Sequence, residues 1–115
     1  PKGIIGDAEN RHVYVADIGD GKTYRYRIAE DGQLTDRIMF CSMGSDGMTI
    51  DEQRNVYLTG RGVTVFNRDG KKISNVPIPK GWTANVTFAG PKRKHLFITA
   101  KDSVFVIKMN VAGLK

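Results

Sequence analysis

The sequence predicts an all-β chain made of three repeats, each a set of short antiparallel strands. The first observation is a strand, a polar turn and a second strand, which recur with Val13, Val56 and Leu96 at matching positions 43 and 40 residues apart. The second is that no segment carries apolar residues with the period of a helix. The third is that further strand-like runs follow each pair. A period of about 40 to 45 residues with four strands per unit is typical of a β-propeller blade.

Each strand is expected from a run of β-branched, aromatic and aliphatic residues bounded by turn residues. The first repeat is expected to form strands at residues 3–7, 12–17, 23–28 and 37–41. The second repeat is expected to form them at residues 47–51, 56–59, 63–67 and 73–78. The third repeat carries only three candidates, at residues 85–89, 95–100 and 103–109. Pro77 falls inside the last strand of the second repeat, and because proline has no N–H to donate, that strand is expected at a sheet edge.

The three repeats are expected to form a single partial β-propeller domain over residues 1–115, with blades at about residues 1–43, 44–81 and 82–115. Known propellers use roughly 4 to 8 blades, so three blades predict half of a six-bladed propeller, its C-terminal half. The chain is therefore interpreted as a fragment. Two faces between blades would then lie open, and we expect self-association or the missing N-terminal half to cover them.

The composition argues against several classes of partner. The net charge is +6 and the pI is about 9.6, but the basic residues are scattered along the chain. Their densest group, residues 92–94, lies in a predicted turn without aromatic neighbours, so no nucleic-acid partner is predicted. No apolar run is long enough to cross a membrane, and no membrane partner is predicted. Cys41 is the single cysteine, which excludes an internal disulfide and a cysteine-cluster metal site and leaves the compartment, cytoplasmic or periplasmic, open.

The four Asp-Gly pairs differ in their place within the repeat. Three lie between strands of one repeat and are interpreted as hairpin turns in which glycine supplies a positive φ: residues 20–21, 31–32 and 69–70. Asp46-Gly47 lies where one blade ends and the next inner strand begins, and Lys2 and Ala84 hold the matching positions of the other repeats. Asp46 is therefore either a turn residue or a carboxylate directed at a metal or substrate on the propeller axis.

Other polar and aromatic residues are weaker candidates. His12 and His95 precede second strands and are expected to be solvated turn residues. Trp82 is expected to pack between blades, with substrate stacking as the alternative. Ser45 has no nucleophile-elbow context, which argues against a serine hydrolase. Three carboxylates that flank strands are expected to serve turns: Asp7, Asp17 and Asp51.

Longer motifs carry a family resemblance that covers nearly the whole chain. Residues 45–52 read Ser-Asp-Gly-Met-Thr-Ile-Asp-Glu, residues 55–60 read Asn-Val-Tyr-Leu-Thr-Gly, and residues 62–66 read Gly-Val-Thr-Val-Phe. Similar motifs follow at residues 82–88, 96–100 and 108–111. In this order they resemble the gluconolactonase branch of the gluconolactonase/regucalcin (senescence marker protein) family.

The resemblance implies a six-bladed propeller that hydrolyses sugar lactones and holds one divalent cation, calcium or zinc, on its axis. It implies that Asp46 is a metal ligand and a catalytic base. The family's Pro-Asn-Gly motif reads Pro1-Lys2-Gly3 here, so Lys2 occupies the expected position of an asparagine ligand. Because an ammonium group has no lone pair to offer, the metal site is incomplete and the isolated chain is expected to be inactive or weakly active.

The leading hypothesis is thus a metal-dependent sugar-lactone hydrolase, a carboxylic ester hydrolase of carbohydrate metabolism. The alternative is a non-catalytic β-propeller module that binds a carbohydrate or a protein. The substrate-binding residues are not identifiable from the sequence. The completeness of the metal site is the feature that separates the two hypotheses.

Overall fold

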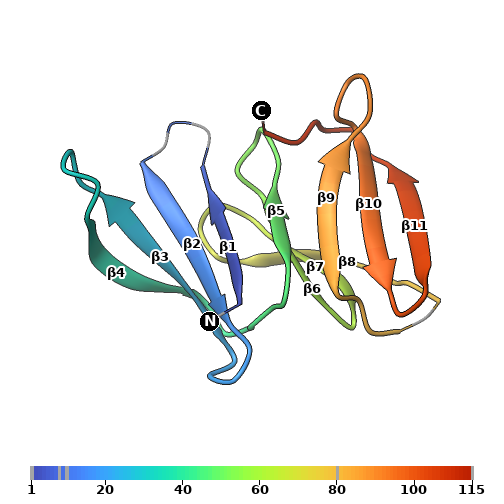
Figure 1. Ribbon diagram of the computed structural model, residues 1–115, viewed down its shortest axis with the longest axis horizontal. Helices are drawn as coiled ribbons and strands as arrows, with labels where there is room; N and C mark the ends of the chain where they lie inside the picture. The colour runs from blue at the N-terminus through green and yellow to red at the C-terminus, as the bar shows by residue number, and fades with distance from the viewer. Residues whose placement is uncertain (1, 8, 10, 80, 115) are drawn as a thin grey trace.

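The computed structural model describes residues 2–7, 9, 11–79 and 81–114, and these residues form strands and turns without a helix (Figure 1). No described segment is therefore a helix that could span a membrane. All eleven strands expected from the sequence are present. Their bounds are β1 (Gly3–Gly6), β2 (His12–Asp17), β3 (Lys22–Ile28), β4 (Leu34–Cys41), β5 (Met48–Ile50), β6 (Val56–Gly60), β7 (Gly62–Phe66), β8 (Lys72–Val76), β9 (Asn85–Ala89), β10 (His95–Ala100) and β11 (Ser103–Lys108).

The strands form three antiparallel sheets that follow the three repeats. The first sheet has the order β1-β2-β3-β4, the second β5-β6-β7-β8, and the third β9-β10-β11. Antiparallel neighbours follow from the short connections, which are too short for a parallel crossover. The shortest joins β6 to β7 through Arg61, and Gly62 there has a φ of +65° and its Cα lies close to the Val76 carbonyl. Pro77 lies just after β8 rather than inside it, where it interrupts no ladder.

The three first strands lie side by side. β5 contacts both β1 and β9, while β4 and β11 lie at opposite ends of the molecule (Figure 1). The second sheet is thus held between the other two. This arrangement brings together the starts of three strands that are about 40 residues apart in sequence.

Two apolar clusters fill the spaces between the sheets. The alternation of side chains along a strand gives the second sheet one apolar face toward each neighbour. The cluster between the first and second sheets contains Tyr14, Ala16, Phe40, Cys41, Met48, Ile50, Val56, Leu58 and Phe66. The cluster between the second and third sheets contains Tyr57, Val63, Val65, Ile78, Val86, Leu96, Ile98 and Ala100. Trp82 belongs to neither and is 57% exposed, so the expectation that it packs between sheets is wrong.

A buried carboxylate organises the turn between β5 and β6. Asp51 is fully buried, and its Oδ1 accepts hydrogen bonds from the backbone N–H groups of Gln53 and Asn55 at 2.8 and 3.0 Å. Its Oδ2 accepts from the Asn55 amide and from the Tyr57 hydroxyl, each at 2.9 Å. Burial raises the pKa of Tyr57 well above its ordinary value, and the Asp51 carboxylate raises it further. The expected turn role of Asp51 is confirmed.

Asp7 holds the matching turn of the first sheet. Its Oδ1 accepts hydrogen bonds from the N–H groups of Arg11 and His12 at 2.9 and 3.3 Å, and its Oδ2 lies 3.0 Å from His12 Nδ1. Burial acts to raise the pKa of Asp7, but these hydrogen bonds outweigh it and hold that pKa below its usual range. His12 was expected to be only a solvated turn residue. It begins β2, as the predicted strand at residues 12–17 required, but its side chain contacts a buried carboxylate.

The Asp51 network can be tested by removing one hydroxyl. Tyr57→Phe should lower the free energy of unfolding by about 1 to 3 kcal/mol, because the buried Asp51 carboxylate loses a donor. Tyr24→Phe is the matched control, since the Tyr24 hydroxyl donates to Asp20 at 2.8 Å in an exposed pair. It should change the stability little. Urea unfolding measures both, and equal effects of the two substitutions would contradict the role given to Asp51.

The Asp7 contacts make a pH-dependent contribution to stability. Because the pKa of Asp7 is lowered by folding, the stabilisation is present above the unfolded-state pKa of about 4 and is lost as the pH falls below it. Asp7→Asn should therefore reduce the free energy of unfolding more at pH 7 than at pH 3. Denaturant titrations of both proteins at the two pH values measure this, and a difference independent of pH would refute it.

Candidate functional site

Asp46 lies at the start of the innermost strand of the second sheet, level with Lys2 and Ala84. The Lys2 N–H donates to the Ala16 carbonyl at 2.9 Å, and the Ala84 N–H donates to the Thr99 carbonyl at 2.8 Å. These bonds place both residues directly before β1 and β9. Asp46 holds the corresponding place before β5, so the register expected from the repeat is observed.

A buried hydroxyl pair holds the backbone on both sides of Asp46. Ser45 is fully buried, and its Oγ donates to the Gly47 carbonyl and accepts from the Thr59 N–H at 2.8 Å. The Thr59 hydroxyl lies 2.9 Å from Ser45 Oγ and accepts from the Gly47 N–H at 3.1 Å. Sequence reasoning considered Ser45 only as a nucleophile. Its position before the Asp-Gly pair, repeated by the buried Thr83 before Ala84, is the signal that could have indicated a structural role.

Gly47 brings the second sheet against the third beside Asp46. A Cβ atom at Gly47 would lie 2.9 Å from the Cα of Asn85 and closer still to its side chain. No side chain fits at that distance, so glycine is required by the contact between β5 and β9 and not only by a turn. The backbone that carries Asp46 is therefore fixed by β6 on one side and by β9 on the other.

The Asp46 carboxylate has a cationic neighbour. Lys2 Nζ lies 3.7 Å from Asp46 Oδ1, and the two side chains are 68% and 32% exposed. An ion pair this exposed contributes little to stability because water screens it. Asp46 thus combines a rigid backbone with an accessible side chain, which is what a reactive or ligand-binding carboxylate needs.

We compared the described residues with the needs of a divalent cation. Calcium takes about 6 to 8 oxygen ligands, and zinc is held by about three or four nitrogen, sulfur or oxygen donors. Among the described residues no group of three or more His, Cys, Asp or Glu side chains could hold a metal. Asp46 offers one carboxylate and its neighbour Lys2 offers a positive charge. The residues described here do not fit a divalent cation by themselves.

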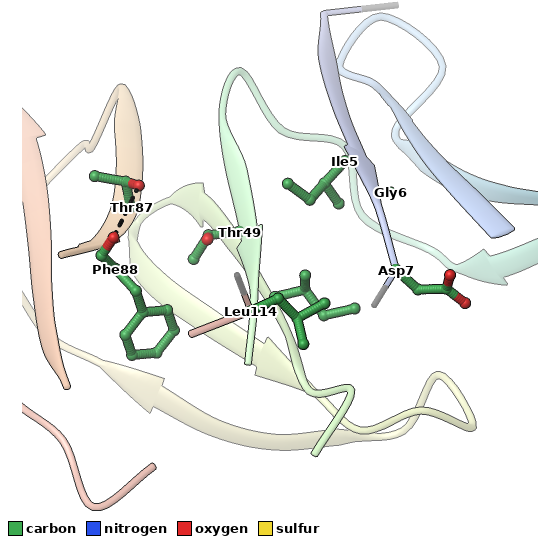
Figure 2. A pocket seen from close by; sticks show the side chains of 8 residues that line it. Ile5, Gly6, Asp7, Thr49, Thr87, Phe88 and Leu114 are labelled. Atoms are coloured by element: carbon green, nitrogen blue, oxygen red, sulfur yellow. Dashed lines mark hydrogen bonds between the residues drawn. The ribbon is translucent and has the colours of Figure 1, made fainter. Parts of the chain in front are cut away.

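A hollow lies at the other end of β1, β5 and β9. It has a volume of about 370 Å³, and its lining comes from all three sheets and from the C-terminal segment (Figure 2): Ile5, Gly6, Asp7, Thr49, Ile50, Thr87, Phe88 and Leu114. Asp46 does not line it. The Asp7 carboxylate is already bonded to Arg11 and His12, and the rest of the lining combines aliphatic side chains and an aromatic ring with two threonine hydroxyls.

The C-terminal segment closes this end, which the local sequence pattern did not indicate. The Glu52 N–H donates to the Ala112 carbonyl at 2.8 Å, and the Leu114 N–H donates to the Ile50 carbonyl at 3.2 Å. Gly113 packs against the Phe88 side chain so closely that a Cβ atom would lie 2.3 Å from the Phe88 Cβ. The segment therefore ties the end of the chain to β5.

The fold and the Asp46 motif can now be compared with known proteins. The pattern of the SMP-30/Gluconolactonase/LRE-like region matches residues 1–102. The chain belongs to this family. The resemblance predicted from the sequence is confirmed, while a sequence search of curated proteins gives no match.

Solved structures of SMP-30/gluconolactonase-type proteins share the fold. A protein assigned provisionally as a gluconolactonase is 28% identical, with a TM-score of 0.90 over 100% of this chain and 40% of its own. A gluconolactonase from Xanthomonas campestris is also 28% identical, with a TM-score of 0.85 over 94% of this chain and 37% of its own. Regucalcin from Agrobacterium tumefaciens, described as a calcium-binding protein, is 20% identical, with a TM-score of 0.85 over 97% and 46%. The chain spans less than half the length of each.

Lys2 places a positive charge beside Asp46, the residue that the family resemblance implies to be a cation ligand. Lys2→Asn should strengthen calcium binding at least roughly fivefold, because a like charge about 4 Å away costs about 1 kcal/mol even in water. The control is Lys72→Asn, which removes the same charge from an exposed residue of β8. Isothermal titration with calcium, zinc and manganese measures both. Tight binding by the unmodified chain, or equal affinities for all three proteins, would contradict this role of Lys2.

Proposed function

We propose that this chain carries the Asp46 side of a lactone-hydrolysing site in a β-propeller. In this proposal the three sheets are consecutive blades and β1, β5 and β9 line the channel. Family membership and the 28% identity to a gluconolactonase support the reaction class. The observation that carries the proposal is the position of Asp46, an accessible carboxylate on a rigid backbone at the start of an innermost strand.

The proposed reaction is hydrolysis of a cyclic sugar ester. Water attacks the lactone carbonyl carbon, the ring C–O bond breaks, and the product is a hydroxy acid. The Asp46 carboxylate acts as a general base that accepts a proton from the attacking water, and this proton passes to the ring oxygen when its C–O bond breaks. The Lys2 ammonium, 3.7 Å away, can donate to the carbonyl oxygen on which negative charge develops.

A divalent cation, calcium or zinc, enters the proposal only through Asp46. The family resemblance implies the cation, and one carboxylate is the ligand that the described residues offer. Its remaining ligands would have to come from outside them. For this reason the proposed proton transfer depends on Asp46 and not on a bound metal.

A non-catalytic module is the second candidate function. The observation that favours it is the position of Lys2 beside Asp46, where a positive charge opposes the binding of a catalytic cation. Such a module would bind a carbohydrate or a protein through the face of the molecule where β1, β5 and β9 begin. It would show binding without turnover.

Hydrolysis of glucono-δ-lactone by the 115-residue chain separates the two functions. We expect a slow rate that exceeds the spontaneous rate and that falls about a hundredfold or more in Asp46→Asn, since the general base is lost. Asp69→Asn is the control, because it makes the same chemical change in an exposed hairpin turn. A pH-stat titration of the acid released measures all three proteins.

The result that would overturn the lactonase proposal is a rate that Asp46→Asn leaves unchanged, or no rate above the spontaneous one. Saturable binding of the lactone or of its hydroxy acid without turnover would then favour the non-catalytic module.

A further inference from the structure

A second hollow, at one end of the third sheet, is lined by cationic side chains. It has a volume of about 340 Å³ and lies where the turn between β9 and β10 meets the end of β11 (Figure 1). Its lining consists of Pro91, Lys92, Lys94, His95 and Lys108. His95 and Lys108 are register partners on adjacent strands, so the turn, β10 and β11 all contribute to one site.

The turn beside this hollow differs in charge from its two copies in the chain. The turns between the first and second strands of the three sheets span residues 7–11, 51–55 and 90–94. The first two each contain two carboxylates and one arginine, a net charge of −1, whereas the third reads Gly-Pro-Lys-Arg-Lys, a net charge of +3. No lysine of the hollow belongs to an ion pair between described residues, and those pairs involve instead Lys2, Arg11, His12 and Arg54.

The histidine of the hollow lacks the partner that its counterpart has. His12 begins β2, and its Nδ1 lies 3.0 Å from the carboxylate of Asp7, the residue directly after β1. His95 begins β10, but the residue directly after β9 is Gly90. A Cβ atom at Gly90 would lie 3.1 Å from His95 Nδ1. The third turn therefore keeps the imidazole beside this position of the chain but has no carboxylate there to meet it.

We propose that this hollow binds a phosphate group, either as the free ion or as part of a small molecule such as a sugar phosphate. A phosphate monoester carries a charge of about −1.5 to −2 at pH 7 and three acceptor oxygens. Three ammonium groups and one imidazole line the hollow as donors, and the phosphate takes the place of the missing carboxylate. The volume falls in the range of small-molecule sites, about 300 to 1,000 Å³.

The proposed phosphate site is separate from Asp46. β9 begins directly after Ala84, which is level with Asp46, and the turn at residues 90–94 follows the other end of β9. Five strand residues at about 3.3 Å each put roughly 15 Å between the two levels. All the lining residues belong to the third sheet and its first turn. The inference therefore does not rest on the lactonase proposal.

Titration of the 115-residue chain with phosphate compounds, followed through its amide NMR signals, tests the proposal. Inorganic phosphate or glucose 6-phosphate should shift the signals of Lys92, Lys94 and Lys108 in a saturable way and leave those of Lys2 and Asp46 unchanged. Glucose is the matched compound without a phosphate and should cause no shift. Tighter binding of glucose 6-phosphate than of inorganic phosphate would assign the ligand as a sugar phosphate, and equal affinities would assign it as the free ion.

Charge substitutions locate the site. Lys92→Glu should weaken binding roughly tenfold or more, because it places a carboxylate beside the phosphate group. Lys108→Gln should weaken it about fivefold or more, because it removes a charge-assisted hydrogen bond from a different strand. Lys101→Glu is the matched control, since it makes the same charge change on an exposed residue at the opposite end of the third sheet. It should change the affinity little.

The absence of saturable shifts at millimolar phosphate would overturn the proposal. So would equal effects of Lys92→Glu and Lys101→Glu, which would indicate a general attraction of anions to a positively charged chain. Tight binding of single-stranded DNA, weakening steeply with salt and not displaced by glucose 6-phosphate, would assign these lysines to a nucleic-acid surface and would also contradict it.

Discussion

The structure depends on the burial of the second sheet between the other two. All five residues of β6 are buried, with Val56 and Leu58 in the cluster shared with the first sheet and Tyr57 in the cluster shared with the third. A buried aliphatic or aromatic side chain contributes about 1.5 to 3 kcal/mol, so this strand is the centre of the stabilising contacts. Among the described residues, each outer sheet packs against the second sheet through one of its faces.

The candidate site is a consequence of the same packing. The hydroxyls of Ser45 and Thr59 form hydrogen bonds with the backbone around Gly47. Gly47 itself has no side chain and so allows the start of β5 to approach Asn85. Between these fixed points only the Asp46 side chain reaches solvent. The packing thus fixes the backbone that carries Asp46, and Lys2, directly before β1, places an ammonium group beside its carboxylate.

The two ends of the innermost strands have different chemistry. At their starts lies the Asp46–Lys2 pair, which is polar and accessible. At their other ends Asp7 and Asp51 accept hydrogen bonds within turns, and Leu114 from the C-terminal segment borders a hollow with both polar and apolar walls. Carboxylates that look alike in the sequence therefore have opposite roles, because buried ones must be satisfied internally while an exposed one need not be.

The sequence by itself determined the strands, their order and the level shared by Lys2, Asp46 and Ala84, because alternation and repeat spacing are local properties that survive in any packing of the sheets. It also determined the family. Only the tertiary structure decided what Ser45 and Trp82 do. The buried Ser45 hydroxyl bonds to Thr59, fourteen residues away, and Trp82 is 57% exposed. The contact of the C-terminal segment with β5 was also decided only by the tertiary structure. A contact between distant segments depends on how whole sheets stack, and it leaves no periodic signal in the sequence.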